Sequence, residues 1–236
     1  MIKRLFILLL LVLFGIMFYN VASHYVEPLE LSPLASRYVD KGPDELGAAN
    51  LVTSVVVTYR GLDTLGEVTV LFLSAAAVGL LLGLSAKASA PEGESKQPKT
   101  ASSELVQTTV EYLVPIIFLF GAYIFINGHL TPGGGFQGGA VIASGILLLF
   151  LGLPLAKLRH TLLGLLESLS GFSYVVVGLL GLILAGGFLD NRFLPLGEYG
   201  QLFSAGAIPL IYIFIGLKVG TELSAVLENF KGNNSD

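Results

Sequence analysis

Residues 128–139 read GHLTPGGGFQGG, and they lie between two apolar stretches that are each long enough to cross a bilayer. Gly and Pro interrupt regular secondary structure more strongly than any other residues. A segment this rich in them, held between two spanning helices, predicts a tight hairpin whose backbone can approach another chain closely. We therefore expect a helical membrane protein in which this hairpin makes contacts.

The composition agrees with a membrane protein. Of the 236 residues, 53% are hydrophobic and 13% are charged, whereas a soluble domain carries about 25% charged residues. The net charge of −4 gives no basis for a nucleic-acid partner, which would require clustered Lys and Arg. The absence of cysteine excludes disulfides, thiolate-bound zinc and iron–sulfur clusters. We expect no catalytic residue, no resident metal and no cofactor.

The apolar stretches predict an all-α polytopic fold with about six crossings, because about 20 apolar residues span a bilayer as a helix. Between the first two crossings, residues 23–47 are predicted to form a polar loop. The apolar part of residues 44–59 is too short to span, so a short half-inserted or interfacial helix is expected there. The predicted crossings are residues 5–22, 65–84, 107–127, 137–156, 161–188 and 201–220.

The charge distribution predicts the orientation. Lys3 and Arg4 precede the first apolar run, which predicts an uncleaved anchor, with cleavage after residues 21–23 as the alternative. The Lys-bearing residues 86–103 and the basic turn at residues 157–160 favour the inner face under the positive-inside rule. We therefore expect a multi-pass protein of the cell membrane with both termini in the cytoplasm.

Three parts of the chain are predicted. Residues 1–85 form a first module with two crossings, and residues 104–236 form a second module with four. Residues 86–103 are rich in Ser, Ala, Pro, Lys and Glu, a composition typical of a flexible linker.

Ionisable groups in spanning segments are costly and indicate function. Asp63 and Glu67 are spaced i,i+4 near the start of the second crossing, and Arg60 lies three residues before Asp63. Two carboxylates this close do not both ionise easily, so one can take up and release a proton or exchange it for Na⁺. The alternative is structural, with both acids favoured at a helix N-terminus.

Two further acids are ion-path candidates. Glu111 lies four residues before Pro115, and helices interrupted near a carboxylate recur in ion paths; an acid at the membrane interface is the alternative. Glu167 lies seven residues after His160 on one helix face, which indicates either a proton route or a polar contact between helices. Lys218 and Glu222 are interpreted as a local ion pair at the inner end of the last crossing.

The hairpin is predicted to dock onto other helices. Gly135 and Gly139 form a small-xxx-small pair, which lets membrane helices approach closely. Phe136 is the only bulky residue among small and polar neighbours and is expected to insert into a partner. His129 is either a hydrogen-bonded loop residue or a proton carrier. The predicted docking residues are His129, Pro132, Gly133, Gly134, Gly135 and Phe136.

At these residues the chain resembles a known family. Residues 104–227, with the glycine-rich string at their centre, resemble the MnhB (MrpB) component of the Mrp-type multisubunit Na⁺/H⁺ antiporters. The string Arg60-Gly61-Leu62-Asp63-Thr64-Leu65-Gly66-Glu67 is similar to the C-terminal end of the large Mrp component, where Phe stands in place of Leu62. The resemblance implies a role in cation exchange for the glutamate at position 67.

The resemblance also implies partners. Similar modules occur in archaeal membrane-bound hydrogenase and sulfur reductase complexes, so we expect a non-redox transport subunit that works with other antiporter subunits in the bilayer. The transported ions would be Na⁺ and H⁺. In the alternative interpretation, the chain seals and docks the antiporter core without carrying ions.

Overall fold

A computed structural model describes residues 2–25, 30–88 and 102–233. Most of the predicted linker, residues 89–101, lies outside the described residues. The described chain is helical and is divided into two units, residues 1–37 and 38–236.

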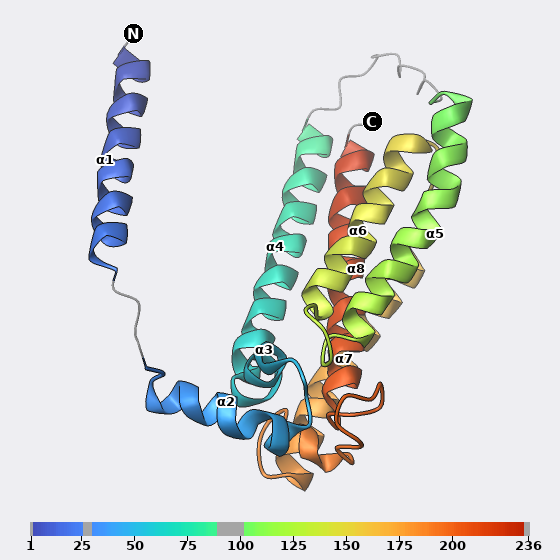
Figure 1. Cartoon of the computed structure of the whole chain (residues 1–236). Helices are drawn as coiled ribbons and strands as arrows, with labels where there is room; N and C mark the ends of the chain where they lie inside the picture. The colour runs from blue at the N-terminus through green and yellow to red at the C-terminus, as the bar shows by residue number, and fades with distance from the viewer. Residues whose placement is uncertain (1, 26–29, 89–101, 234–236) are drawn as a thin grey trace. The chain divides into compact units, whose positions relative to one another are not determined.

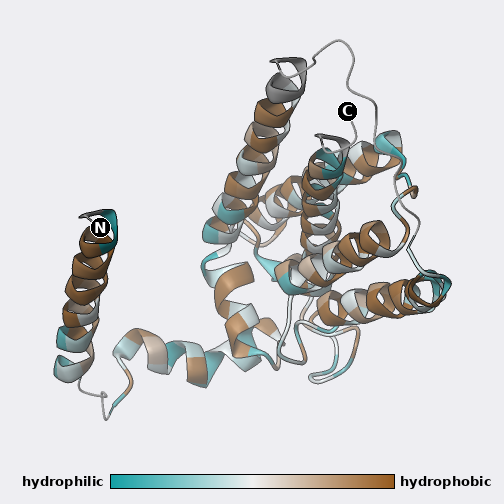
Figure 2. Cartoon of the chain, turned by 90° about the horizontal axis from the view of Figure 1, so that it is seen from above, coloured by the Kyte–Doolittle hydropathy of each residue, from teal (hydrophilic) through white to brown (hydrophobic). Residues whose placement is uncertain are grey.

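The first unit contains helix α1 (Ile2–His24). No residue of its spanning window is buried, and the window has a mean hydropathy of 2.6. Figure 2 shows hydrophobic residues around most of the α1 surface. A helix that is apolar on all sides belongs in a bilayer, which agrees with the predicted first crossing.

The predicted polar loop over residues 23–47 is wrong in its second half, where helix α2 (Pro33–Leu46) forms. Tyr38, Gly42 and Leu46 recur every four residues and therefore lie on one helix face. Gly42 and Leu46 are buried, and the Tyr38 ring stacks on Tyr59 with centroids 4.8 Å apart. The i,i+4 spacing in the sequence is the signal of this helix.

The predicted short helix before the second crossing is present in two parts. Helix α3 (Leu51–Thr53) continues into a π-helical turn, η1 (Ser54–Tyr59). Neither is long enough to be a candidate span. π-Helical turns are rare and occur often at functional sites.

Six described helices are long and apolar enough to cross a membrane, which confirms the predicted number of crossings. After α1 come five such spanning helices, of which α4, α5, α6 and α8 run side by side in Figure 1. A 3₁₀ turn, η2 (Asn191–Phe193), precedes the last one. The five are α4 (Gly61–Ala88), α5 (Glu104–Ile126), α6 (Gly135–Gly152), α7 (His160–Leu184) and α8 (Ile208–Asn233).

Helix α8 forms the centre of the second unit. It packs against α4, α5, α6 and α7, and half of its spanning window is buried, against 6% for α4. Its buried face consists of large apolar residues that recur at helical spacing. They are Ile208, Ile211, Tyr212, Ile215 and Val219.

Glycines allow α6 to lie directly on its neighbours, as the small-residue spacing predicts. A Cβ on Gly139 would lie 2.8 Å from the Gly216 carbonyl oxygen of α8. A Cβ on Gly138 would lie 2.6 Å from the Gly121 carbonyl oxygen of α5. Because backbone atoms face backbone atoms at these points, only Gly fits there.

The predicted bounds of the last crossing, residues 201–220, are wrong. Helix α8 begins at Ile208 and ends at Asn233. The segment before it holds Ala205 and Gly206 at positive φ, which a helix does not permit. The shift moves Lys218 and Glu222 from the end of the crossing to its interior.

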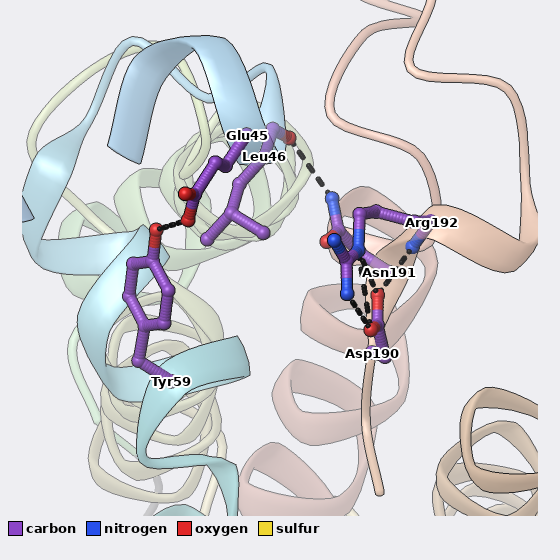
Figure 3. A network of polar contacts seen from close by, with 6 residues as sticks. All are labelled: Glu45, Leu46, Tyr59, Asp190, Asn191 and Arg192. Carbon is purple, nitrogen blue, oxygen red and sulfur yellow. Dashed lines mark hydrogen bonds and ion pairs between the residues drawn. The ribbon is translucent and has the colours of Figure 1, made fainter. Parts of the chain in front are cut away.

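The loop before α8 packs against α2, as Figure 3 shows. The Asn191 side-chain amide donates to the Leu46 carbonyl at 2.9 Å and to the Ala205 carbonyl at 2.8 Å. A hydrogen bond from the Arg192 guanidinium lowers the pKa of Asp190. These contacts join the two predicted modules from residue 38 onward within one unit.

Candidate functional site

The buried ion pair of Lys218 and Glu222 lies in the interior of α8. Lys218 Nζ donates to Glu222 Oε1 at 2.5 Å, and the side chains are 12% and 1% exposed. Glu222 lies about 20 Å from the start of α8 at a rise of about 1.5 Å per residue. The hydrocarbon core of a bilayer is about 30 Å thick, so the pair lies well inside the crossing.

This placement corrects the interpretation of a local pair at the end of the crossing. Apolar residues continue past the pair at Leu223, Val226 and Leu227, and this run was the signal that the helix extends further. Around the pair, Lys218 Nζ lies 5.0 Å from the centre of the Phe72 ring of α4. On the other side, a Cβ on Gly171 of α7 would lie 3.3 Å from the Lys218 side chain.

A cavity of about 220 Å³ lies next to the pair, between α4, α7 and α8. Its polar lining consists of Glu222 and Asn229 of α8 and Glu167 of α7. The α4 wall is apolar and is formed by Phe72, Ala75, Ala76 and Gly79. The structure thus places the sequence candidate Glu167 in the same cavity as Glu222.

One oxygen of Glu222 and the Glu167 carboxylate at this cavity lack partners among the described residues. Glu222 Oε2 is buried and accepts no hydrogen bond there. Glu167 is half-buried, and no ion pair or hydrogen bond joins its side chain to a described residue. We call Lys218 and Glu222 of α8, together with Glu167 of α7 that faces the same cavity, the α8 cluster.

A proton route along α7 would bring His160 close to Glu167. The structure instead pairs His160 with another residue. Its ring Nε2 lies 3.3 Å from Glu228 Oε1 of α8, and its side chain is 77% exposed. Lys231 contacts the Ala156 carbonyl and the Phe150 ring nearby. These groups lie at the end of the helices away from the hairpin.

Asp63 and Glu67 both lie on α4 and are both exposed. The Arg60 guanidinium donates to Asp63 Oδ2 at 2.6 Å. The ion pair of Asp63 is therefore with Arg60, and no described hydrogen bond joins its carboxylate to that of Glu67. Glu67 makes no ion pair or hydrogen bond with the described residues, although it is within electrostatic range of Tyr174 on α7. Thr64, between them, faces inward and donates to the Val56 carbonyl.

Glu111 is exposed on α5 near Pro115, which lies inside the helix. It contacts neither the cavity nor the α8 cluster. The structure therefore separates the four ion-path candidates. Glu167 lines the cavity, Asp63 and Glu67 lie on the exposed face of α4, and Glu111 lies on α5, outside the cavity lining.

The glycine-rich hairpin is fastened to the first module by Asn50, which the sequence analysis did not single out. The Asn50 side-chain amide donates to the Gly128 carbonyl at 2.9 Å and to the Thr131 carbonyl at 3.0 Å. Its Oδ1 accepts from the backbone amides of Val52 and Thr53 and so caps α3. One side chain thus joins segments that are far apart in sequence.

Replacing Asn50 by Ala is expected to lower the free energy of unfolding by about 2 kcal/mol or more, because carbonyls and amides at a packed site lose their partner. Thermal unfolding of the purified protein in detergent measures the loss. Asn127→Ala is the matched control, since its amide bonds only within its own helix end, to Tyr123. Equal losses in both variants would contradict a fastening role for Asn50.

The predicted docking residues pack largely within the chain. Phe136 is partly buried against the α8 core instead of projecting outward. A Cβ on Gly135 would lie 2.5 Å from Ile215, and one on Gly134 would meet the Tyr212 ring at 3.2 Å. Gly133 also has a positive φ of 155°. Pro132 is exposed and is the docking candidate left at the surface.

His129 is fully buried in the hairpin, with its Nε2 3.3 Å from the Gln201 carbonyl oxygen. Desolvation by burial lowers the pKa of the ring. A buried ring with a lowered pKa is neutral near pH 7. These contacts favour the hydrogen-bonded loop residue over the proton carrier.

Two family models match the chain. Residues 105–225 match a domain related to the MnhB subunit of Na⁺/H⁺ antiporters. Residues 2–96 match MbhE, one of the subunits of MBH.

Individual proteins are similar to most or all of the chain. A chain of the membrane-bound sulfane sulfur reductase (MBS), an archaeal respiratory membrane complex, superposes with a TM-score of 0.81 at 40% identity, over 98% of both chains. The Mrp complex from Dietzia sp. gives a TM-score of 0.76 at 26% identity, over 99% of this chain and 26% of that chain. An uncharacterized protein of Methanocaldococcus jannaschii is 32% identical over 74% of each chain.

Proposed function

Since the chain belongs to the family related to the MnhB subunit of Na⁺/H⁺ antiporters, we propose that it forms part of the ion path of a multisubunit Na⁺/H⁺ antiporter module. It is a membrane antiporter subunit rather than an enzyme in its own right. The transported ions would be Na⁺ and H⁺, with no cofactor on this chain. The proposal extends to a host complex that couples such a module to redox chemistry, supported by the similarity to a chain of a sulfur reductase complex.

The observation that carries the ion-path role is the Glu67 carboxylate. It is exposed on α4, inside a candidate crossing, and has no ion-pair or hydrogen-bond partner among the described residues. A charged side chain within a spanning segment is costly when it faces lipid. In the assembled module Glu67 would therefore be covered by a polar surface of a neighbouring protein, and an ion would pass between the two.

The neighbouring proteins would also cover other surfaces. Glu111 is exposed within α5, and Pro132 lies exposed at the hairpin. We propose that these positions contact other antiporter subunits or, for Glu111, the membrane interface. The basic residues Lys157 and Arg159, at the end away from the hairpin, support an orientation with that end and both termini in the cytoplasm.

Glu67→Gln in the intact complex is expected to lower Na⁺-dependent proton antiport at least about tenfold, which corresponds to about 1.4 kcal/mol in the barrier. The substitution keeps the size of the side chain and removes its charge and its titration. Antiport is measured in everted vesicles as the pH change that follows addition of Na⁺.

Glu104→Gln is the control, because Glu104 is also an exposed glutamate on a spanning helix but lies in its first turn. It should leave antiport unchanged. If the Glu67→Gln complex assembles and transports at the rate of the control, the chain is a structural subunit that does not carry ions through Glu67.

A further inference from the structure

We propose that the cavity between α4, α7 and α8 is an exchange site for one monovalent cation and one proton, with Glu222 as the principal ligand and Glu167 as the second. The inference deepens the proposed function by assigning it a site inside this chain, separate from the exposed Glu67. The ligand class is a hard monovalent cation such as Na⁺, for which carboxylate and amide oxygens are suitable ligands.

The first argument is the unpartnered oxygen of Glu222. The side chain is 1% exposed, Oε1 accepts from Lys218, and Oε2 has no partner among the described residues. A buried polar group without a partner costs about 1–3 kcal/mol, and more when it is charged. Because Glu222 also lines the cavity, a small movement of its carboxylate would bring this buried oxygen to a ligand bound there.

The second argument is charge balance. With all three groups of the α8 cluster ionised, two carboxylates face one ammonium, which leaves one negative charge. The facing wall of α4 offers no ionisable group among the described lining residues. One cation or one proton neutralises the cluster. A cation and a proton bound together would leave it with a net positive charge. Binding of one therefore competes with binding of the other.

The exchange step balances without an oxidant or a reductant. The carboxyl proton of Glu222 passes to a water molecule in the cavity as the cation enters, and the carboxylate oxygen that held it becomes a cation ligand. When the cation leaves, a proton returns to the same oxygen. Lys218 holds the other oxygen in place through its hydrogen bond.

The space is adequate for this step. A water molecule occupies about 30 Å³ of liquid, so about 220 Å³ accommodates a cation with several waters. Asn229, about two helical turns beyond Glu222 on α8, lines the same space and offers an amide oxygen. Toward the hairpin, the buried Tyr174 hydroxyl has no partner among the described residues and lies within electrostatic range of Glu67. Polar groups thus extend from the cavity toward the exposed α4 carboxylate.

Difference infrared spectroscopy on the purified complex tests the site. At constant pH, replacing choline by Na⁺ should remove a protonated-carboxyl stretching band from the complex. Glu222→Gln should abolish this component of the difference spectrum, whereas the Glu104→Gln control should keep it. Equilibrium binding of ²²Na⁺ should show the loss of one bound ion per complex in Glu222→Gln.

A second variant covers the case in which Glu222→Gln alone does not assemble. The double variant Lys218→Met with Glu222→Gln removes both charges of the buried pair, so that neither remains without the other, and it should assemble. It should also lack the Na⁺-dependent band. A band and a ²²Na⁺ stoichiometry that match the wild-type complex in an assembled variant would overturn the inference.

The Glu222 test and the Glu67 test can fail independently of each other. If Glu67→Gln abolishes antiport while the Glu222 variants keep the band, the ion path stands and the internal site does not exist. If Glu67→Gln transports normally while the Glu222 variants lose the band, the internal site stands and the path does not pass Glu67.

Discussion

Glu222→Ala is expected to lower the free energy of unfolding by about 3–5 kcal/mol, because removal of one partner leaves the other as an uncompensated buried charge. Lys218 is only 12% exposed and lies against Phe72 and Gly171, so its ammonium is largely shielded from solvent. The thermal midpoint in detergent and the yield of assembled complex measure the effect.

The double variant Lys218→Met with Glu222→Leu should recover most of the lost stability, since apolar residues of similar volume replace the whole pair. The exposed Glu104→Gln control should change stability by less than about 1 kcal/mol. If the single and double variants were equally unstable, the loss would come from packing and not from the charge.

Gly139→Leu is expected to prevent α6 from packing on α8 and to cost about 3 kcal/mol or more, the upper part of the range for overpacked cores. Its Cβ would lie 2.8 Å from the Gly216 carbonyl oxygen and 2.9 Å from the Gly220 amide nitrogen. These are backbone atoms, which cannot move aside as a flexible side chain can. The amount of folded chain in membranes and its thermal midpoint report the change.

Gly164→Leu on α7 is the matched control, because a Cβ at Gly164 meets nothing within 4 Å. It should leave folding nearly unchanged. Gly139→Ala should fall between the two, and equal behaviour of the Gly139 and Gly164 variants would contradict the close approach of α6 and α8.

The six crossings were predictable from hydropathy alone, because about 20 apolar residues in a row require either a bilayer or a large core. The small-residue spacing at Gly135 and Gly139 also predicted close helix packing, and the structure confirms it. Helix α2 and the shifted bounds of α8 were missed. Both contain mixed polar and apolar residues, for which i,i+4 periodicity is a weaker signal than a continuous apolar run.

The candidate site was only partly predictable. Glu167 was identified as an ionisable residue in a crossing, but its neighbour Glu222 was interpreted as one half of a terminal ion pair. A sequence shows that Lys218 and Glu222 are one turn apart on a helix, and it does not show which face of that helix is covered. Asn50 was missed because a single Asn before a short helix is a common cap, and its bonds to the hairpin depend on a distant segment.

The sequence by itself determined the membrane class, the number of crossings and the resemblance to the antiporter family, since hydropathy and short motifs are local properties of the chain. Only the tertiary structure decided which carboxylates share a cavity. That depends on how far each helix is rotated about its axis when it packs, and here the backbone contacts at the glycines and the bulky apolar face of α8 set the rotation. The same packing turns Glu222 and Glu167 toward each other and leaves Glu67 on the outer face of α4.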